Sequence, residues 1–119
     1  MRAILIDPYE PQRVAEIDVN HEREGLYEAI GCQWVECGPV ISGHMMFVNG
    51  DEQRNLLSEP FFSYDGYVYS GRAVILGLCL KTGASLPCTM TVEEVASKVR
   101  WVYPVLGAGG IQFVSEVAL

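Results

Sequence analysis

The chain has 119 residues, half of them hydrophobic and 19% charged, and it has no apolar run near the ~20 residues that a membrane-spanning helix needs. This length favours a single domain over residues 1–119, with a core at 1–103 and a Gly-rich loop and C-terminal strand or subunit-contact tail at 104–119. The net charge of −7 leaves no basic stripe for phosphate neutralisation, so we expect no direct binding to a nucleic-acid duplex.

Residues in the first half alternate between strand and helix signals. Residues 2–6 are apolar and end at Asp7-Pro8, and residues 14–19 alternate apolar with polar, which predicts an opening β-hairpin. Leu26, Ala29 and Ile30 form an apolar stripe before Gly31, which predicts a helix from about residue 21 to 30. Residues 33–37 and 44–48 should form a second hairpin.

The second half predicts a central strand and a second helix. Residues 72–80 are almost continuously apolar, as in a strand covered on both faces. Thr91 to Glu94 fits a capping box, so a helix is expected from about 92 to 102. The stretch 52–60 should be irregular or a single helical turn, and residues 111–117 favour a last strand. The expected fold class is α+β: a mostly antiparallel sheet of five to six strands with two short helices.

Five of the twelve aromatic residues lie in the segment 61–72, which ends on Arg72. In one interpretation Phe61 and Phe62 cover a sheet, Asp65-Gly66 is a tight turn and Arg72 pairs with an acid. In the other, Tyr64, Tyr67, Tyr69 and Arg72 line a pocket or contact surface, because tyrosine rings stack on bases and a guanidinium meets phosphate. Both interpretations remain open at this stage.

The Gly-rich loop at 107–110 is either a flexible turn or an anion nest in which the amides of Gly109 and Gly110 meet phosphate. It lacks the lysine and the following helix of a phosphate-binding loop. The four cysteines form no CxxC pair, and Cys32, Cys37 and His44 lack the spacing of a zinc knuckle. We therefore expect reduced thiols, no metal, no cofactor and no catalytic residues.

Acidity is concentrated in residues 1–60, which hold eleven acids against four bases. Such a face either aids solubility or contacts a basic protein surface. The candidate contact residues are Glu10, Glu16, Asp18, Glu22, Glu24 and Glu28.

Several strand and turn motifs together resemble a known family. They are Val-Ala-Glu-Ile-Asp-Val at 14–19, Leu-Tyr-Glu-Ala-Ile-Gly at 26–31, Met-Met-Phe-Val-Asn-Gly-Asp at 45–51 and Tyr-Ser-Gly-Arg-Ala-Val-Ile-Leu-Gly at 69–77. The pattern over residues 1–103 resembles the small phage and bacterial proteins catalogued as domain of unknown function 3846. This resemblance brings no catalytic residues, but it implies a phage or mobile-element origin and expression in the bacterial cytoplasm.

From that context we expect a non-enzymatic, homo-oligomeric phage-type protein that counters host defence by sequestering a small nucleotide immune signal. The alternative is an acidic inhibitor that binds a host defence enzyme directly. No membrane partner is expected.

Overall fold

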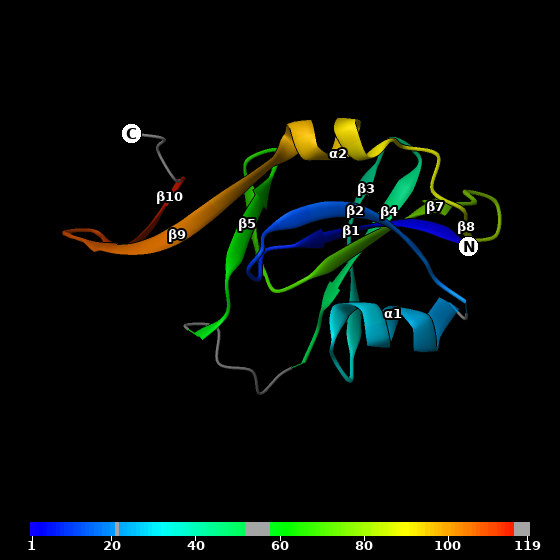
Figure 1. Cartoon of the computed structure of the whole chain (residues 1–119), viewed down its shortest axis with the longest axis horizontal. Coiled ribbons are helices and arrows are strands. Elements are labelled where there is room, and N and C mark those ends of the chain that lie inside the picture. The colour runs from blue at the N-terminus through cyan, green and yellow to red at the C-terminus, as the bar shows by residue number, and fades with distance from the viewer. Residues whose placement is uncertain (21, 52–57, 116–119) are drawn as a thin grey trace.

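The computed structural model describes residues 1–20, 22–51 and 58–115, with two antiparallel sheets and two short helices (Figure 1). The α+β class is therefore confirmed. The first sheet has the order β2-β1-β7-β4-β3, and the short β8 pairs with the end of β7. Its strands are β1 (Arg2–Asp7), β2 (Arg13–Asp18), β3 (Val35–Ile41), β4 (His44–Asn49), β7 (Ala73–Leu78) and β8 (Ser85–Leu86).

The second sheet has the order β10-β9-β5-β6, so the expected count of five to six strands accounts for the first sheet alone. Its strands are β5 (Phe61–Tyr64), β6 (Tyr67–Ser70), β9 (Val99–Gly107) and β10 (Gly110–Ser115). Strands β5 and β6 form a hairpin around Asp65-Gly66, as predicted. Both turn residues have positive φ, 51° and 90°, which suits aspartate and glycine.

The predicted opening hairpin and central strand are confirmed. Strand β1 pairs with β2 along its full length and with β7 on its other side, where Ile4 faces Ile75. Strand β7 also pairs with β4, so its apolar run is enclosed by neighbours on both edges. Its first five residues are buried, which explains why the sequence there does not alternate.

The helices are α1 (Glu22–Ile30) and α2 (Val92–Lys98). Helix α2 begins as predicted, because the Thr91 hydroxyl accepts a hydrogen bond from the Glu94 N–H at 3.0 Å. It ends at Lys98 and not near residue 102. The next residues, rich in β-branched and aromatic side chains, instead pair with β5: Val99 faces Tyr64, and Val102 faces Phe61.

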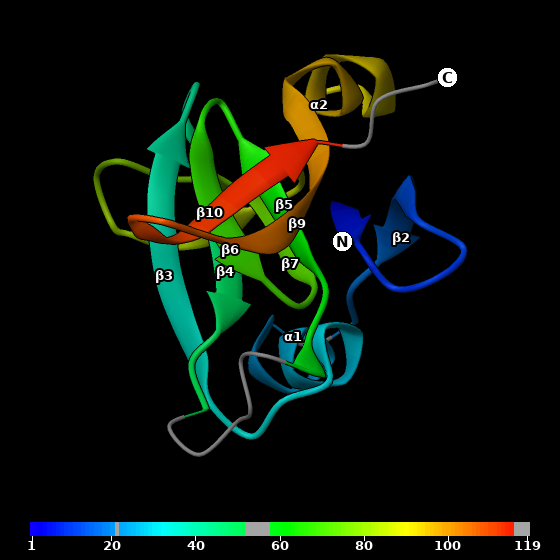
Figure 2. The ribbon, with the colours of Figure 1, turned by 90° about the vertical axis from the view of Figure 1, so that its left-hand side faces the viewer.

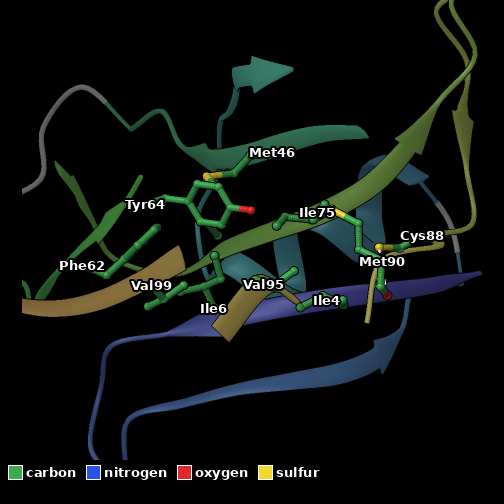
Figure 3. Packing of buried hydrophobic residues seen from close by; sticks show 11 residues of the cluster. Ile4, Ile6, Met46, Phe62, Tyr64, Ile75, Cys88, Met90, Val95 and Val99 are labelled. Carbon is green, nitrogen blue, oxygen red and sulfur yellow. Dashed lines mark hydrogen bonds between the residues drawn. The ribbon is translucent and has the colours of Figure 1, made fainter. Parts of the chain in front are cut away.

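Two hydrophobic clusters cover the two faces of the first sheet. One lies between the sheets and under α2, and Figure 3 shows its side chains converging around Ile6 and Val95. The other lies beneath α1 and includes Leu26 and Ile30. The first cluster consists of Ile4, Ile6, Met46, Phe62, Tyr64, Ala73, Ile75, Cys88, Met90, Val95 and Val99.

Strands β9 and β10 form an arm that extends from the body of the molecule (Figures 1 and 2). Strand β9 pairs with β5 only as far as Val102, and its remaining length pairs with β10 alone. All six residues of β10 are exposed. The predicted strand at 111–117 is thus present over the part that the structure describes.

Most of the stretch 52–60, predicted to be irregular or a single helical turn, falls at 52–57, outside the described residues. No helix in the described ranges combines the length and apolarity needed to cross a membrane.

Candidate functional site

Tyr64, one of the predicted ligand-binding residues, lies in the core. Its side chain is 5% exposed and points toward Met46 and Ile75 between the sheets (Figure 3). Burial raises the pKa of its phenol above the ordinary value. Tyr64 therefore cannot stack on a ligand in this conformation.

The other two tyrosines of the segment lie in β6 on the same face as Tyr64 but differ sharply in exposure. Tyr69 is half-buried and stacks on Phe62 with ring centroids 5.5 Å apart. Burial also raises the pKa of the Tyr69 phenol. Tyr67, at 73% exposure, projects into solvent. The three tyrosines share one face of the β5–β6 hairpin but lie at different depths, so the structure does not present all three rings to a ligand.

Arg72 matches the structural alternative considered from the sequence. Its Nε lies 3.2 Å from the Asp7 carboxylate, and its guanidinium lies 4.3 Å from the centre of the Tyr9 ring. Asp7 is buried, so this cation compensates a carboxylate that has little access to water. Arg72 thereby joins β7 to the β1–β2 turn and is already engaged within the fold.

Gly109 and Gly110 lie at the tip of the β9–β10 arm. Residues 107 and 110 close a two-residue hairpin loop, and Gly110 has a φ of 110° that favours glycine. The loop is thus the hairpin turn between β9 and β10 of the second sheet, whereas the Asp7–Arg72 pair lies at the end of β1 and just before β7 in the first sheet. The predicted grouping of these glycines with Arg72 does not occur.

The structure instead forms a cleft where α1 meets β3 and β4. Its volume is about 430 Å³, within the range of small-molecule sites. Leu26, Val35 and Phe47 also pack on the core cluster beneath α1, so they supply an apolar floor. The described residues that line it are Arg23, Leu26, Tyr27, Trp34, Val35, Cys37 and Phe47.

Trp34 is the most distinctive member of this cleft because it is 62% exposed and yet firmly held through its backbone. The Asp51 carboxylate accepts hydrogen bonds from the Trp34 N–H at 2.8 Å and from the Gln33 N–H at 3.0 Å. The Gly50 N–H donates to the Trp34 carbonyl at 2.7 Å. The Asn49-Gly50-Asp51 turn, at the end of β4, therefore fixes the backbone of Trp34, from which the indole projects.

The absence of a side chain at Gly50 leaves room for the Trp34 ring. A Cβ at this position would lie 2.8 Å from the indole Cδ1 and 2.5 Å from the Glu36 Cγ, closer than real Cβ contacts. Any larger residue would displace Trp34 or Glu36. The turn that the sequence marks only as Asn-Gly-Asp is thus part of the cleft's support.

The same kinds of side chain that we sought in segment 61–72, aromatic rings beside a guanidinium, occur in this cleft as Tyr27, Trp34 and Arg23. Sequence reasoning missed them because they are spread over α1 and the start of β3 with no local concentration. Trp34 offered one signal: in the predicted strand 33–37 it shares a face with Glu36, so its ring has no apolar stripe to join.

The acidic residues predicted to contact a protein lie in different parts of the fold. Asp18, Glu24 and Glu28 line a hollow of about 360 Å³ on another side of α1. Glu16 pairs with Arg2 across the β1–β2 hairpin, and Glu10 lies exposed in the β1–β2 turn. The side chain of Glu22 lies outside the described residues.

The histidine considered as a metal ligand is a structural residue. His44 is buried, its Nδ1 lies 2.8 Å from the Ser42 carbonyl oxygen, and its Nε2 accepts the Thr89 N–H at 3.0 Å. Because Nε2 accepts, the ring proton of these contacts lies on Nδ1, which donates to the Ser42 carbonyl oxygen. Within the described ranges, no group of three or more His, Cys, Asp or Glu side chains is placed to hold a metal ion.

Searches of curated proteins and of solved structures found no match to the chain. A family model described as a domain of unknown function, DUF3846, matches residues 1–99. That range covers both clusters of the core and the α1 cleft, and it ends at the first residue of β9. The chain therefore belongs to the family known as domain of unknown function 3846.

Proposed function

We propose that this protein is a non-enzymatic binding protein that holds a small nucleotide in the cleft formed by α1, β3 and β4. The observation that carries the proposal is the pre-positioned, exposed Trp34 beside Tyr27 and Arg23 over an apolar floor. An exposed ring held by its backbone can stack on a base without first being ordered. Arg23 would meet phosphate, since a guanidinium forms paired hydrogen bonds with its oxygens.

In this proposal the protein acts in a bacterial host cell by sequestering a nucleotide signal of the host's defence. The support is the nature of the cleft, which offers stacking and a cation but no evident nucleophile at its centre. Cys37 lines the cleft, but the described residues place no histidine in its lining. A site of this composition favours retention of a ligand over its chemical conversion.

The test is incubation with cyclic dinucleotides and cyclic ADP-ribose isomers, followed by removal of protein and measurement of the free nucleotide. We expect one of them to be depleted, to raise the melting temperature, and to return chemically intact after heat denaturation. A nucleotide returned in altered form would indicate an enzyme. Absence of depletion and of any melting shift would refute the proposal.

Two variants locate the site. Trp34→Ala should weaken retention by about 5-fold to about 150-fold, since stacking on an aromatic ring contributes about 1–3 kcal/mol per base. Tyr67→Ala is the matched control, because Tyr67 is also a highly exposed ring but lies in β6, outside the cleft. Equal loss in both variants, or loss only in Tyr67→Ala, would contradict the assignment to this cleft.

A second candidate function rests on the acidic hollow lined by Asp18, Glu24 and Glu28. There the protein would bind a basic surface of a host defence enzyme. Binding to that enzyme should weaken steeply with salt, since exposed charges are screened. Glu24→Lys should abolish it, while Glu10→Lys, an equal charge change in the β1–β2 turn, should have little effect. Binding unaffected by salt or by Glu24→Lys would exclude this surface.

A further inference from the structure

The β9–β10 arm carries an unusual run of uncharged residues. Residues 101–115 contain no Asp, Glu, Lys or Arg, in a chain that is 19% charged and has a net charge of −7. The arm exposes apolar side chains on both faces: Leu106, Ile111 and Phe113 lie on one, Tyr103, Val105 and Val114 on the other. Leu106 is 83% exposed.

Strand β10 is also an unprotected sheet edge. It has one neighbour in the described sheet, β9. Natural proteins usually protect such edges with charges, prolines or bulges, and the sequence Gly-Ile-Gln-Phe-Val-Ser at 110–115 has no charge or proline, while its register with β9 is unbroken. The edge is thus free of the features that oppose strand pairing.

The hairpin register shows which backbone groups face outward. The pair that closes the two-residue loop, Gly107 with Gly110, is a bonded pair, and bonded and non-bonded pairs alternate along an antiparallel ladder. Phe113 opposite Pro104 then falls at a non-bonded position, which suits a proline because it has no N–H. Ile111, Phe113 and Ser115 therefore direct their backbone N–H and C=O away from β9.

We propose that β10 pairs with β10 of a second copy of this chain, antiparallel about a two-fold axis at Phe113. The three outward-facing residues are then all used: Phe113 faces Phe113 of the second copy, and Ile111 faces Ser115. The two four-stranded sheets become one continuous eight-stranded sheet. Because a two-fold contact uses the same edge on both copies, assembly stops at the dimer.

The absence of charge in the arm favours a second copy as the partner. Two chains of net charge −7 repel, but the arm lets them approach through a segment that carries no charge. On β10 the apolar side chains that adjoin the second copy are Ile111, Phe113 and Val114, which together offer on the order of 200 Å² of apolar surface per copy. This is less than the apolar share of a standard interface of about 800 Å² per partner, so the dimer should depend on protein concentration.

Phe113 already has a role that the dimer would extend. Its ring lies 4.9 Å from that of Phe61, and both line an apolar groove of about 470 Å³ together with Val48 and Val68. In the paired arrangement the two Phe113 side chains share one sheet face across the axis, each backed by its own Phe61. The dimer would thus have a row of four phenylalanine rings at its centre.

Sedimentation equilibrium at high and low protein concentration tests the association. We expect a mass of twice 13.2 kDa for the native chain at high concentration. Phe113→Lys should give a monomer at the same concentration, because it places two like charges opposite each other. Val114→Lys is the matched control: Val114 and Phe113 are 45% and 39% exposed, but Val114 lies on the other face, so that variant should still dimerise.

Amide hydrogen exchange tests the pairing itself and needs no variant. The amides of Ile111, Phe113 and Ser115 should be protected at high concentration and lose protection on dilution, while those of Gln112 and Val114, which face β9, should not respond. A native chain that stays monomeric at high concentration would overturn the proposal. So would a dimer in which the Phe113 amide exchanges freely. The outcome is independent of nucleotide binding, since the arm lies outside the α1 cleft.

Discussion

Replacing Asp51 should lower the stability of the protein and make the Trp34 side chain more mobile. Asp51 is not among the described residues that line the cleft, so the lining itself stays unchanged. The carboxylate accepts backbone hydrogen bonds from Trp34 at 2.8 Å and from Gln33 at 3.0 Å. Hydrogen bonds to a charged acceptor contribute about 1.5–3 kcal/mol each, and water replaces part of this at an exposed position. We therefore expect Asp51→Ala to cost about 2 kcal/mol, which lowers the Tm of a domain of this size by about 8 °C.

Urea denaturation measures this cost, and tryptophan fluorescence measures the freedom of the indole. The chain has two tryptophans, so the background variant Trp101→Phe leaves Trp34 as the single reporter. In that background Asp51→Ala should lower the fluorescence anisotropy of Trp34. Asp51→Asn keeps one acceptor oxygen without the charge and should lose about half as much stability.

A small effect of Asp51→Ala would refute the role of Asp51 in holding Trp34. Surface substitutions without a structural role usually change stability by no more than about 0.5 kcal/mol. If Asp51→Ala stays within that limit and the anisotropy of Trp34 is unchanged, then the turn does not hold the indole. The nucleotide proposal would lose its main physical support, because Trp34 would not be pre-positioned.

Three further predictions concern the fold. Arg72→Met should cost about 3 kcal/mol in urea denaturation, because it leaves the buried Asp7 carboxylate without its nearest cation; this is the low end for a buried pair, since the Arg72 side chain is 34% exposed, and a neutral result would contradict the pairing. Burial raises the pKa of the Tyr64 phenol, so the stability that the neutral phenol contributes is complete below about pH 10 and is lost as pH rises through the raised value. The urea midpoint should therefore fall above about pH 10. In Tyr64→Phe, which has no phenol to ionise, it should fall less steeply. Thr91→Ala removes the acceptor for the Glu94 N–H and should cost about 1 kcal/mol, with loss of helical circular dichroism if α2 frays, whereas Thr91→Ser should retain most of the stability.

The sequence predicted most elements correctly where local patterns are strong. The alternation at 14–19, the apolar run at 73–78 and the capping box at Thr91 each depend on neighbouring residues, so they can be recognised without knowledge of the fold. The end of α2 could not be recognised in this way. Val99 to Val102 become strand because β5 offers a ladder, and that partner lies far away in the sequence.

The candidate site shows the same limit. Segment 61–72 is rich in aromatic residues, but strand alternation and the second sheet decide that Tyr64 faces the core, while the buried Asp7 takes Arg72. A count of side chains cannot reveal which of them are already engaged.

The sequence by itself determined the α+β class, the family, the acidic first half and the uncharged stretch at 101–115, because these follow from composition and short-range periodicity. Only the tertiary structure brought Arg23, Tyr27 and Trp34 into one cleft and left β10 as an open edge. Both depend on contacts between residues distant in the chain. The free energy of those contacts comes from the packing of whole elements and not from any local pattern.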